Sequence, residues 1–197
     1  MYQVVGNVRS RAFRVLWALE EIGQAYEHVP AGPRSEVALA HNPLGKVPAL
    51  VDGDTSLTDS MAILTYLADK HGALTAPAGT IARAQQDAVT FWLVDEFDAL
   101  LWTAAKHSFV LPEEARVPAI KDSLRVEFAR QIDLFADKIA GEFVMGDAIT
   151  VPDILAVHCL NWAVGAKFPV ENDAVNAYAK RLRARDAFKA VRALDPD

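Results

Sequence analysis

Ser10 is the first of three short features in which residue types and spacing could support chemistry. It follows a short apolar segment at residues 2–5 and precedes a helix-forming stretch. Its hydroxyl could donate to a ligand thiolate near the positive end of that helix, assisted by Arg11 or Arg14. The alternative is a plain helix N-cap, which is a common use of serine and is favoured when the feature is taken alone.

The second feature is Thr58-Asp59-Ser60, at the start of another helix-forming stretch. Unpaired backbone N–H groups and the positive end of the dipole make a helix start a carboxylate site, and the Ser60 hydroxyl would add a donor. The alternative is again an ordinary N-cap, the more common use of Asp and Ser before an apolar run.

The third feature is Lys46-Val47-Pro48, just before a short apolar segment at residues 49–51. Proline cannot donate a ladder hydrogen bond, so Pro48 must lie at a sheet edge or in a special turn. A cis Val47–Pro48 bond would turn the Val47 backbone groups outward, ready to pair with an extended peptide. Spacing alone favours a trans bond, because only about 5% of X–Pro bonds in folded proteins are cis.

Strand and helix signals alternate over the first third of the chain, which holds all three features. Strands are predicted at residues 2–5, 25–29, 49–51 and 56–57, and helices at 11–22, 34–40 and 59–71. A helical crossover favours parallel pairing, whereas the tight turn at Asp52-Gly53 requires an antiparallel pair. The order βαβαββα therefore predicts a mixed four-stranded sheet.

Strand signals end after the loop-like residues 73–79. One long helix is predicted over 83–106, and apolar residues recur at helical spacing over 120–139. Two or three shorter helices follow Thr150, which with Asp153 has the spacing of a structural capping box. We expect a mixed α/β domain at 1–74, a linker at 75–81 and an all-helical domain at 82–197.

The composition excludes several classes of function. The net charge of −6 argues against a nucleic-acid partner, because phosphate binding needs a surplus of Lys and Arg. Cys159 is the single cysteine, so neither an intrachain disulfide nor a CxxC redox motif can form. No signal peptide, membrane partner or metal site is predicted, and we expect a cytoplasmic protein.

Four segments, in order, resemble the cytosolic glutathione transferase superfamily, in particular its serine-type, bacterial-like members. The segments are SRAFRVLWALEE at 10–21, NPLGKVPAL at 42–50, LTDSMAI at 57–63 and GDAITVPD at 146–153. The resemblance covers nearly the whole chain. It implies a thioredoxin-like N-terminal domain followed by a helical bundle, a cis Val47–Pro48 bond, and a homodimer.

The resemblance also implies a glutathione site in the first domain. Asp59 and Ser60 would hold the γ-glutamyl end, and the Val47 backbone before Pro48 would pair with the cysteinyl unit. The glycyl carboxylate would meet Lys46, with Arg34 or His41 as further candidates. The γ-glutamyl amino group would meet Asp95 or Glu96.

The implied activity is attack of the glutathione thiolate on an apolar, electrophilic small molecule, as in detoxification. Ser10 would hydrogen-bond the thiolate and lower the thiol pKa from roughly 8.5, with Asn7 and Arg11 as reserve candidates. The residues expected to line the electrophile pocket are Val8, Arg9, Trp102, Lys106, His107 and Phe109. Alternatives are a glutathione-binding carrier or regulator, or a glutathione-dependent peroxidase, dehalogenase or isomerase.

Overall fold

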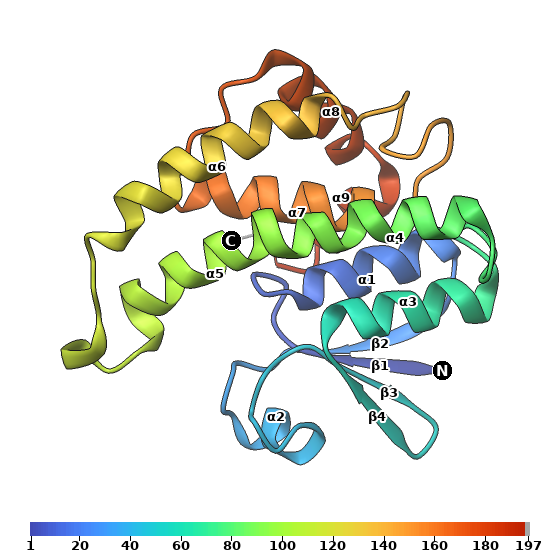
Figure 1. Ribbon diagram of the computed structural model, residues 1–197. Helices are drawn as coiled ribbons and strands as arrows, with labels where there is room; N and C mark the ends of the chain where they lie inside the picture. Colours follow the sequence, from blue (N-terminus) through green and yellow to red (C-terminus); the bar gives the residue numbers. More distant parts are fainter. Residues whose placement is uncertain (196–197) are drawn as a thin grey trace. The chain divides into compact units, whose positions relative to one another are not determined.

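The structure is a computed structural model that describes residues 1–195 (Figure 1). Contacts between residues group the chain into two compact units. The first unit comprises Met1–Ala78 together with the segment that begins at Arg183, and the second comprises Gly79–Leu182. The expected all-helical domain at 82–197 therefore needs a correction, because its last segment packs with the first unit.

A four-stranded sheet in the order β2-β1-β3-β4 forms the base of the first unit. Its strands are β1 (Tyr2–Val5), β2 (Tyr26–Val29), β3 (Ala49–Asp52) and β4 (Thr55–Thr58). β1 is parallel to β2 and antiparallel to β3, and β3 is antiparallel to β4. The predicted mixed sheet is confirmed, with the parallel pair joined through a helix and the β3–β4 pair through a tight turn.

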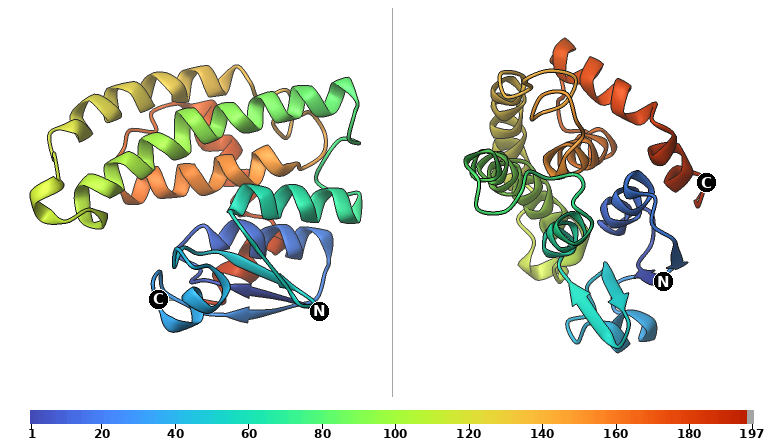
Figure 2. Two further views of the ribbon diagram at one scale, coloured as in Figure 1. Left: turned by 60° about the horizontal axis from the view of Figure 1, so that its bottom comes forward. Right: turned by 90° about the vertical axis from the view of Figure 1, so that its right-hand side faces the viewer.

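Helix α1 lies at the centre of the first unit. The helices of this unit are α1 (Ala12–Ile22), α2 (Glu36–His41), α3 (Ser60–His71) and α9 (Asp186–Arg192). α1 and α3 lie side by side over one face of the sheet (Figures 1 and 2), and α1 also packs against α9. All eight residues from Ala12 to Leu19 are consequently buried. Seven of these eight residues are apolar, as expected for a helix that is covered all round, and the exception is Arg14.

The second unit consists of helices. They are α4 (Ile81–Leu93), α5 (Ala99–Ala105), α6 (Ile120–Ala136), α7 (Val151–Gly165) and α8 (Asp173–Arg183). A π-helical turn at Val94–Asp98 joins α4 to α5, and a second at Lys106–Val110 follows α5. The helix predicted over 83–106 thus exists but contains a π-turn, which sequence periodicity does not reveal. Within residues 1–195, no helix is both long and apolar enough to cross a membrane.

Aromatic side chains fill the core of the second unit. The Phe97 ring lies 4.9 Å from Phe128 and 5.4 Å from Phe135, centroid to centroid, and none of the three is exposed. The unit therefore has a core of its own.

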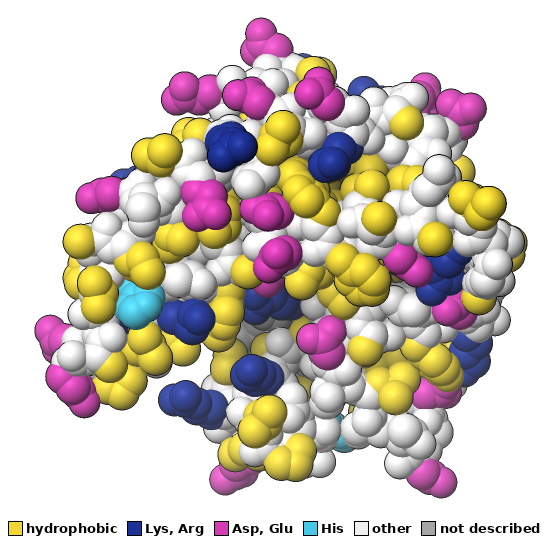
Figure 3. Space-filling view, in the orientation of Figure 1, with side chains coloured by type: hydrophobic (Ala, Val, Ile, Leu, Met, Phe, Trp, Pro, Cys, Tyr) yellow, Lys and Arg dark blue, Asp and Glu magenta, His cyan; other side chains and the backbone are white. Residues whose placement is uncertain are grey.

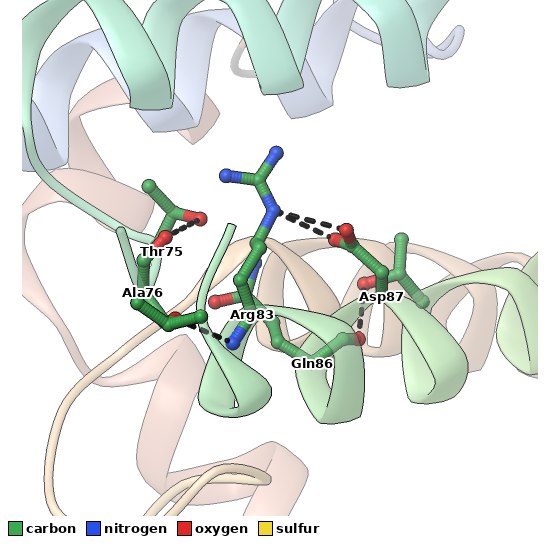
Figure 4. Close-up of polar contacts among 7 residues, drawn as sticks. Thr75, Ala76, Arg83, Gln86 and Asp87 are labelled. Atoms are coloured by element: carbon green, nitrogen blue, oxygen red, sulfur yellow. Dashed lines mark hydrogen bonds and ion pairs between the residues drawn. The ribbon is translucent and has the colours of Figure 1, made fainter. Parts of the chain in front are cut away.

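Helix α4 carries an ion pair near its N-terminal end. Arg83 Nε donates there to both carboxylate oxygens of Asp87, one turn later (Figure 4).

The capping box at the start of α7 is present, as predicted from Thr150 and Asp153. The fully buried Asp153 carboxylate accepts from the backbone N–H groups of Val144 and Thr150, from the Thr150 hydroxyl and from the Tyr178 hydroxyl. Burial raises the pKa of Asp153, and these four donors oppose that shift because they stabilise the charged form. Asp153 therefore ties the loop before α7 to α8.

We predict that Asp153→Ala lowers the free energy of unfolding by about 3 kcal/mol or more. Each buried donor left without an acceptor costs about 1–3 kcal/mol, and this substitution removes the acceptor of several buried donors. Urea unfolding followed by circular dichroism measures the effect. Asp147→Ala is the matched control, since Asp147 is an exposed acid six residues earlier and should change stability by less than about 0.5 kcal/mol. Equal losses in both variants would contradict the prediction.

Candidate functional site

The sheet brings the three sequence features together at one end of its strands. Val5, the last residue of β1, pairs with Ala49, the first residue of β3. Ala49 also pairs with Thr58, the last residue of β4. The segments that adjoin these paired residues are therefore neighbours in space. They are the loop after β1 with Ser10, the Val47-Pro48 pair before β3, and the Asp59-Ser60 pair after β4.

Gly6 shows how closely these segments approach one another. Its φ is +145°, and a Cβ built on it would lie 2.8 Å from the Ala12 Cβ and 3.1 Å from the Val47 Cβ. A side chain at this position would therefore separate the start of α1 from Val47. The absence of a Cβ lets the Ser10 loop lie against the Val47-Pro48 segment.

The Ser10 hydroxyl is hydrogen-bonded within the turn that leads into α1. Its hydroxyl donates to the Asn7 carbonyl at 2.7 Å, and its Oγ accepts the Ala12 N–H at 3.1 Å. Because a hydroxyl has one proton, Ser10 would have to turn it away from Asn7 before it could donate to a thiolate. The reserve candidates lie in the same turn, with Asn7 exposed and Arg11 half-buried.

The Val47–Pro48 bond is cis, as the family resemblance implied and against the base rate. Val47 is half-buried and lies outside the strands. Neither its N–H nor its C=O is hydrogen-bonded to any other residue in the described part of the chain. A donor and an acceptor on one residue are the groups that an extended peptide needs for pairing.

Asp59 and Ser60 have different tasks at the start of α3. Asp59 Oδ1 caps the helix by accepting from Met61 N–H at 2.8 Å and Ala62 N–H at 3.2 Å, whereas Oδ2 has no hydrogen bond within residues 1–195. Ser60 is buried, and its backbone N–H, in the first turn, likewise has no partner there. The Ser60 N–H and hydroxyl thus remain as donors beside the positive end of α3.

Arg14 lies beneath this helix terminus, although we expected it beside Ser10. Its side chain is 1% exposed, and Nη1 donates to Ser60 Oγ at 3.2 Å. The bond occupies a lone pair of the hydroxyl and so leaves the Ser60 proton to be donated elsewhere. A buried guanidinium next to a helix N-terminus adds positive charge where a carboxylate would bind. No motif in the sequence distinguishes Arg14 from the neighbouring arginines.

Arg34 and Lys46 lie near each other in the loops around α2. Arg34 N–H donates to the carbonyl of Gly45 at 2.8 Å, and Gly45 directly precedes Lys46. Both basic side chains are exposed. Figure 3 shows Lys or Arg side chains beside exposed apolar ones in the region of α2. His41, by contrast, contacts β4, with Nδ1 2.9 Å from Ser56 Oγ.

The residues expected to line an electrophile pocket lie in both units. In the first unit Val8 is buried, and Arg9 pairs with Asp195. In the second unit Trp102, Lys106 and His107 are partly buried, and Phe109 is 70% exposed. His107 Nδ1 accepts the Val117 N–H at 3.0 Å, which leaves Nε2 to carry the proton of the neutral ring.

Asp95 and Glu96 lie in the π-helical turn between α4 and α5. Glu96 Oε2 accepts from Gln131 Nε2 at 2.6 Å, so this carboxylate already has a partner within the second unit. Asp95 is exposed.

Known proteins resemble this chain in sequence over most of its length. The family model described as "Glutathione S-transferase, N-terminal domain" matches residues 10–76. Glutathione S-transferase 3 of Zea mays is 30% identical over 203 residues, which cover 93% of this chain and 89% of that protein. The chain belongs to the glutathione transferase family. The zeta-class enzyme of Euphorbia esula is 31% identical, covering 92% of this chain and 82% of its own length.

Solved structures of glutathione transferases have the same fold, a thioredoxin-like domain and a helical region. The enzyme from Methylococcus capsulatus superposes with a TM-score of 0.86 at 24% identity, covering 98% of both chains. A homolog from Sulfitobacter, solved with bound glutathione, has a TM-score of 0.85 at 23% identity and the same coverage. The predicted fold class is therefore confirmed.

We predict that Gly45→Ala destabilises the protein more than Gly53→Ala does. Both glycines have a positive φ, 62° and 58°, so an alanine at either position costs about 1–2 kcal/mol. At Gly45 the new Cβ would also lie 3.0 Å from the Arg34 Cα, whereas nothing lies within 4 Å at Gly53. We expect this clash to add about 1–3 kcal/mol in urea unfolding. Equal losses would show that the Arg34 loop adapts freely.

Proposed function

We propose that this glutathione transferase is an enzyme that conjugates the glutathione thiolate to an apolar electrophile. The observation that carries the proposal is the set of hydrogen-bond donors at the start of α3. There the buried Ser60 offers a backbone N–H and a hydroxyl, and the buried Arg14 contacts that hydroxyl. The nearby backbone of Val47 offers a peptide-pairing edge at the same end of the sheet.

The γ-glutamyl end of glutathione carries one carboxylate and one ammonium group. The carboxylate would accept from the Ser60 N–H and hydroxyl, with the charge of Arg14 and the α3 dipole nearby. The ammonium group would meet Asp59 Oδ2, the carboxylate oxygen that does not cap the helix. Donor and acceptor groups of the site are thus complementary to this end of the ligand.

The middle and the glycyl end of glutathione would extend along the Val47 segment. The cysteinyl amide groups would pair with the backbone of Val47, and the glycyl carboxylate would meet Lys46 and the neighbouring Arg34. Both basic side chains are exposed, so each contact would contribute little at physiological salt. We give His41 a smaller role, because its ring is engaged with Ser56.

Thiol activation is assigned to Ser10. Glutathione has a thiol pKa of roughly 8.5, so a thiolate at neutral pH needs a donor that favours the charged form. On binding, the sulfur would compete with the Asn7 carbonyl for the Ser10 proton, and a charged acceptor forms the stronger hydrogen bond. The thiolate then attacks the electrophile. Within the first unit, we assign recognition of the electrophile to Val8 and Arg9, which adjoin Ser10 in the sequence.

A glutathione-binding carrier without turnover is the second candidate. The observation that favours it is the hydrogen bond from Ser10 to the Asn7 carbonyl, which uses the hydroxyl proton for the fold. Steady turnover of an aryl halide, compared with binding to immobilised glutathione, separates the two functions. Binding without turnover above the uncatalysed rate would establish the carrier.

We predict that Ser10→Ala and Ser60→Ala affect different kinetic constants. Ser60→Ala should raise the KM for glutathione about ten- to hundredfold, because a hydrogen bond to a charged group contributes about 1.5–3 kcal/mol. Ser10→Ala should mainly lower kcat at neutral pH and shift the pH–rate profile upward, with activity recovering as solvent removes the thiol proton. Glutathione affinity should change less in this variant. An unmoved profile would make Ser10 a helix cap only, with Asn7 or Arg11 next to be tested.

We further propose that the enzyme is a homodimer. Helix α4 exposes large apolar side chains, Ile81 at 80% and Phe91 at 68% exposure, and the exposed Ala84 and Ala88 lie between them in the sequence. Small residues beside a protruding aromatic side chain allow a second helix to approach closely.

We predict a dimer in light scattering at micromolar concentration, which Phe91→Asp converts largely to monomer because it places a charge in an apolar contact. The matched control is Val126→Asp on α6, where an equally exposed apolar residue (74%) is changed. A wild-type monomer would contradict the dimer, and equal effects of both variants would contradict the assignment to α4.

A further inference from the structure

An ion pair joins the C-terminal segment to the loop that carries Ser10. Arg9 Nε donates to Asp195 Oδ2 at 2.9 Å, and Arg9 Nη2 donates to Asp195 Oδ1 at 3.3 Å. This is a forked contact between a guanidinium and a carboxylate, which sets the orientation of both groups. Because Arg9 is adjacent to Ser10, the ion pair restrains the backbone next to the Ser10 hydroxyl.

The rest of the segment is anchored more firmly to α1. Arg185 forms a second forked pair with Glu21, at 2.7 Å for both bonds, and Glu21 also accepts from Trp17 Nε1 at 2.9 Å. The Phe188 ring lies 5.0 Å from Phe13 and 5.1 Å from Trp17, centroid to centroid, and is 6% exposed. The segment is therefore part of the first unit, and Asp195 is presented from a packed base.

The turn at residues 7–10 is tied to the sheet at its first end. Asn7 N–H donates to the Ala31 carbonyl at 3.0 Å, and the Gly6 carbonyl lies 2.8 Å from His28 Nε2. Ser10 N–H closes the turn onto the Asn7 carbonyl at 3.0 Å. At the other end, Arg9 is held by Asp195. The Ser10 carbonyl also accepts the Phe13 N–H of α1 at 3.1 Å, so the ion pair adds a side-chain restraint at Arg9 to a turn whose Ser10 end already joins the helix.

We propose that Asp195 is a positioning residue, which acts through Arg9 to hold the turn of residues 7–10 so that the Ser10 hydroxyl can reach the glutathione sulfur. The inference rests on the proposed function, because it assumes that Ser10 activates the thiol. The hydroxyl must leave the Asn7 carbonyl for the sulfur, so a small displacement of the turn changes which acceptor takes its proton.

The test measures the pKa of the bound glutathione thiol, by the ultraviolet absorbance of the thiolate, together with kcat and KM. Asp195→Asn and Arg9→Gln should each raise that thiol pKa and lower kcat at neutral pH about two- to fivefold, in line with a partly exposed ion pair. Activity should recover at higher pH, and the KM for glutathione should stay near wild type. The exchange of charges, Arg9→Asp with Asp195→Arg, should restore much of the loss.

Salt provides a second readout that a purely structural role would not give. Raising the ionic strength should move the wild-type thiol pKa toward the variant values, since salt screens an exposed pair, and should leave the two variants unchanged. The matched control is Asp186→Asn, which removes a fully exposed carboxylate from the same segment, at 3.4 Å from Lys189. This control should leave the thiol pKa, kcat and the melting temperature at wild-type values.

Several results would overturn the inference. A wild-type thiol pKa in Asp195→Asn would show that the pair does not position the turn. A lowered thiol pKa in Asp195→Asn with a raised one in Arg9→Gln would show that Arg9 acts by its charge, which Asp195 neutralises. A wild-type protein that neither binds nor turns over glutathione would overturn the proposed function together with this inference, whereas the first two results leave that function intact.

Discussion

Burial of α1 on every side is the constraint on which the first unit depends. The sheet, α3 and α9 surround it, and eight consecutive residues from Ala12 to Leu19 are buried. Among them is Arg14, a charge that is costly to bury without partners. Its contact with Ser60 therefore links the packing of this helix to the start of α3, where the candidate site begins.

The candidate site contains backbone groups that have no hydrogen-bond partner among residues 1–195. Regular strands and helices satisfy their backbone groups internally, but the residues beside a strand end or in a first helical turn do not. Val47 before β3 and Ser60 at the start of α3 are such residues. A small anionic peptide could supply the missing partners, which is the physical reason why we propose that glutathione binds at this end of the sheet.

In the proposed mechanism, the Ser10 hydroxyl would serve both a contact of the fold and a catalytic contact. Its hydroxyl completes the turn before α1 in the structure, and the proposed mechanism requires the same proton for the sulfur. The bond to the charged sulfur would be the stronger one, but the hydroxyl must first turn away from the Asn7 carbonyl. The surroundings of the turn, including the pair between Arg9 and Asp195, then determine which acceptor is favoured.

The sequence by itself determined the strand and helix order, the mixed sheet and the capping box at Asp153, because periodicity, turn residues and caps act over short range. Family resemblance, rather than local spacing, indicated the cis bond before Pro48. Only the tertiary structure placed Arg14 under Ser60, Asp195 beside Arg9, and the segment from Arg183 against α1. These are contacts between residues far apart in the chain, and their formation depends on how surfaces pack after the local elements exist, which a local pattern does not encode.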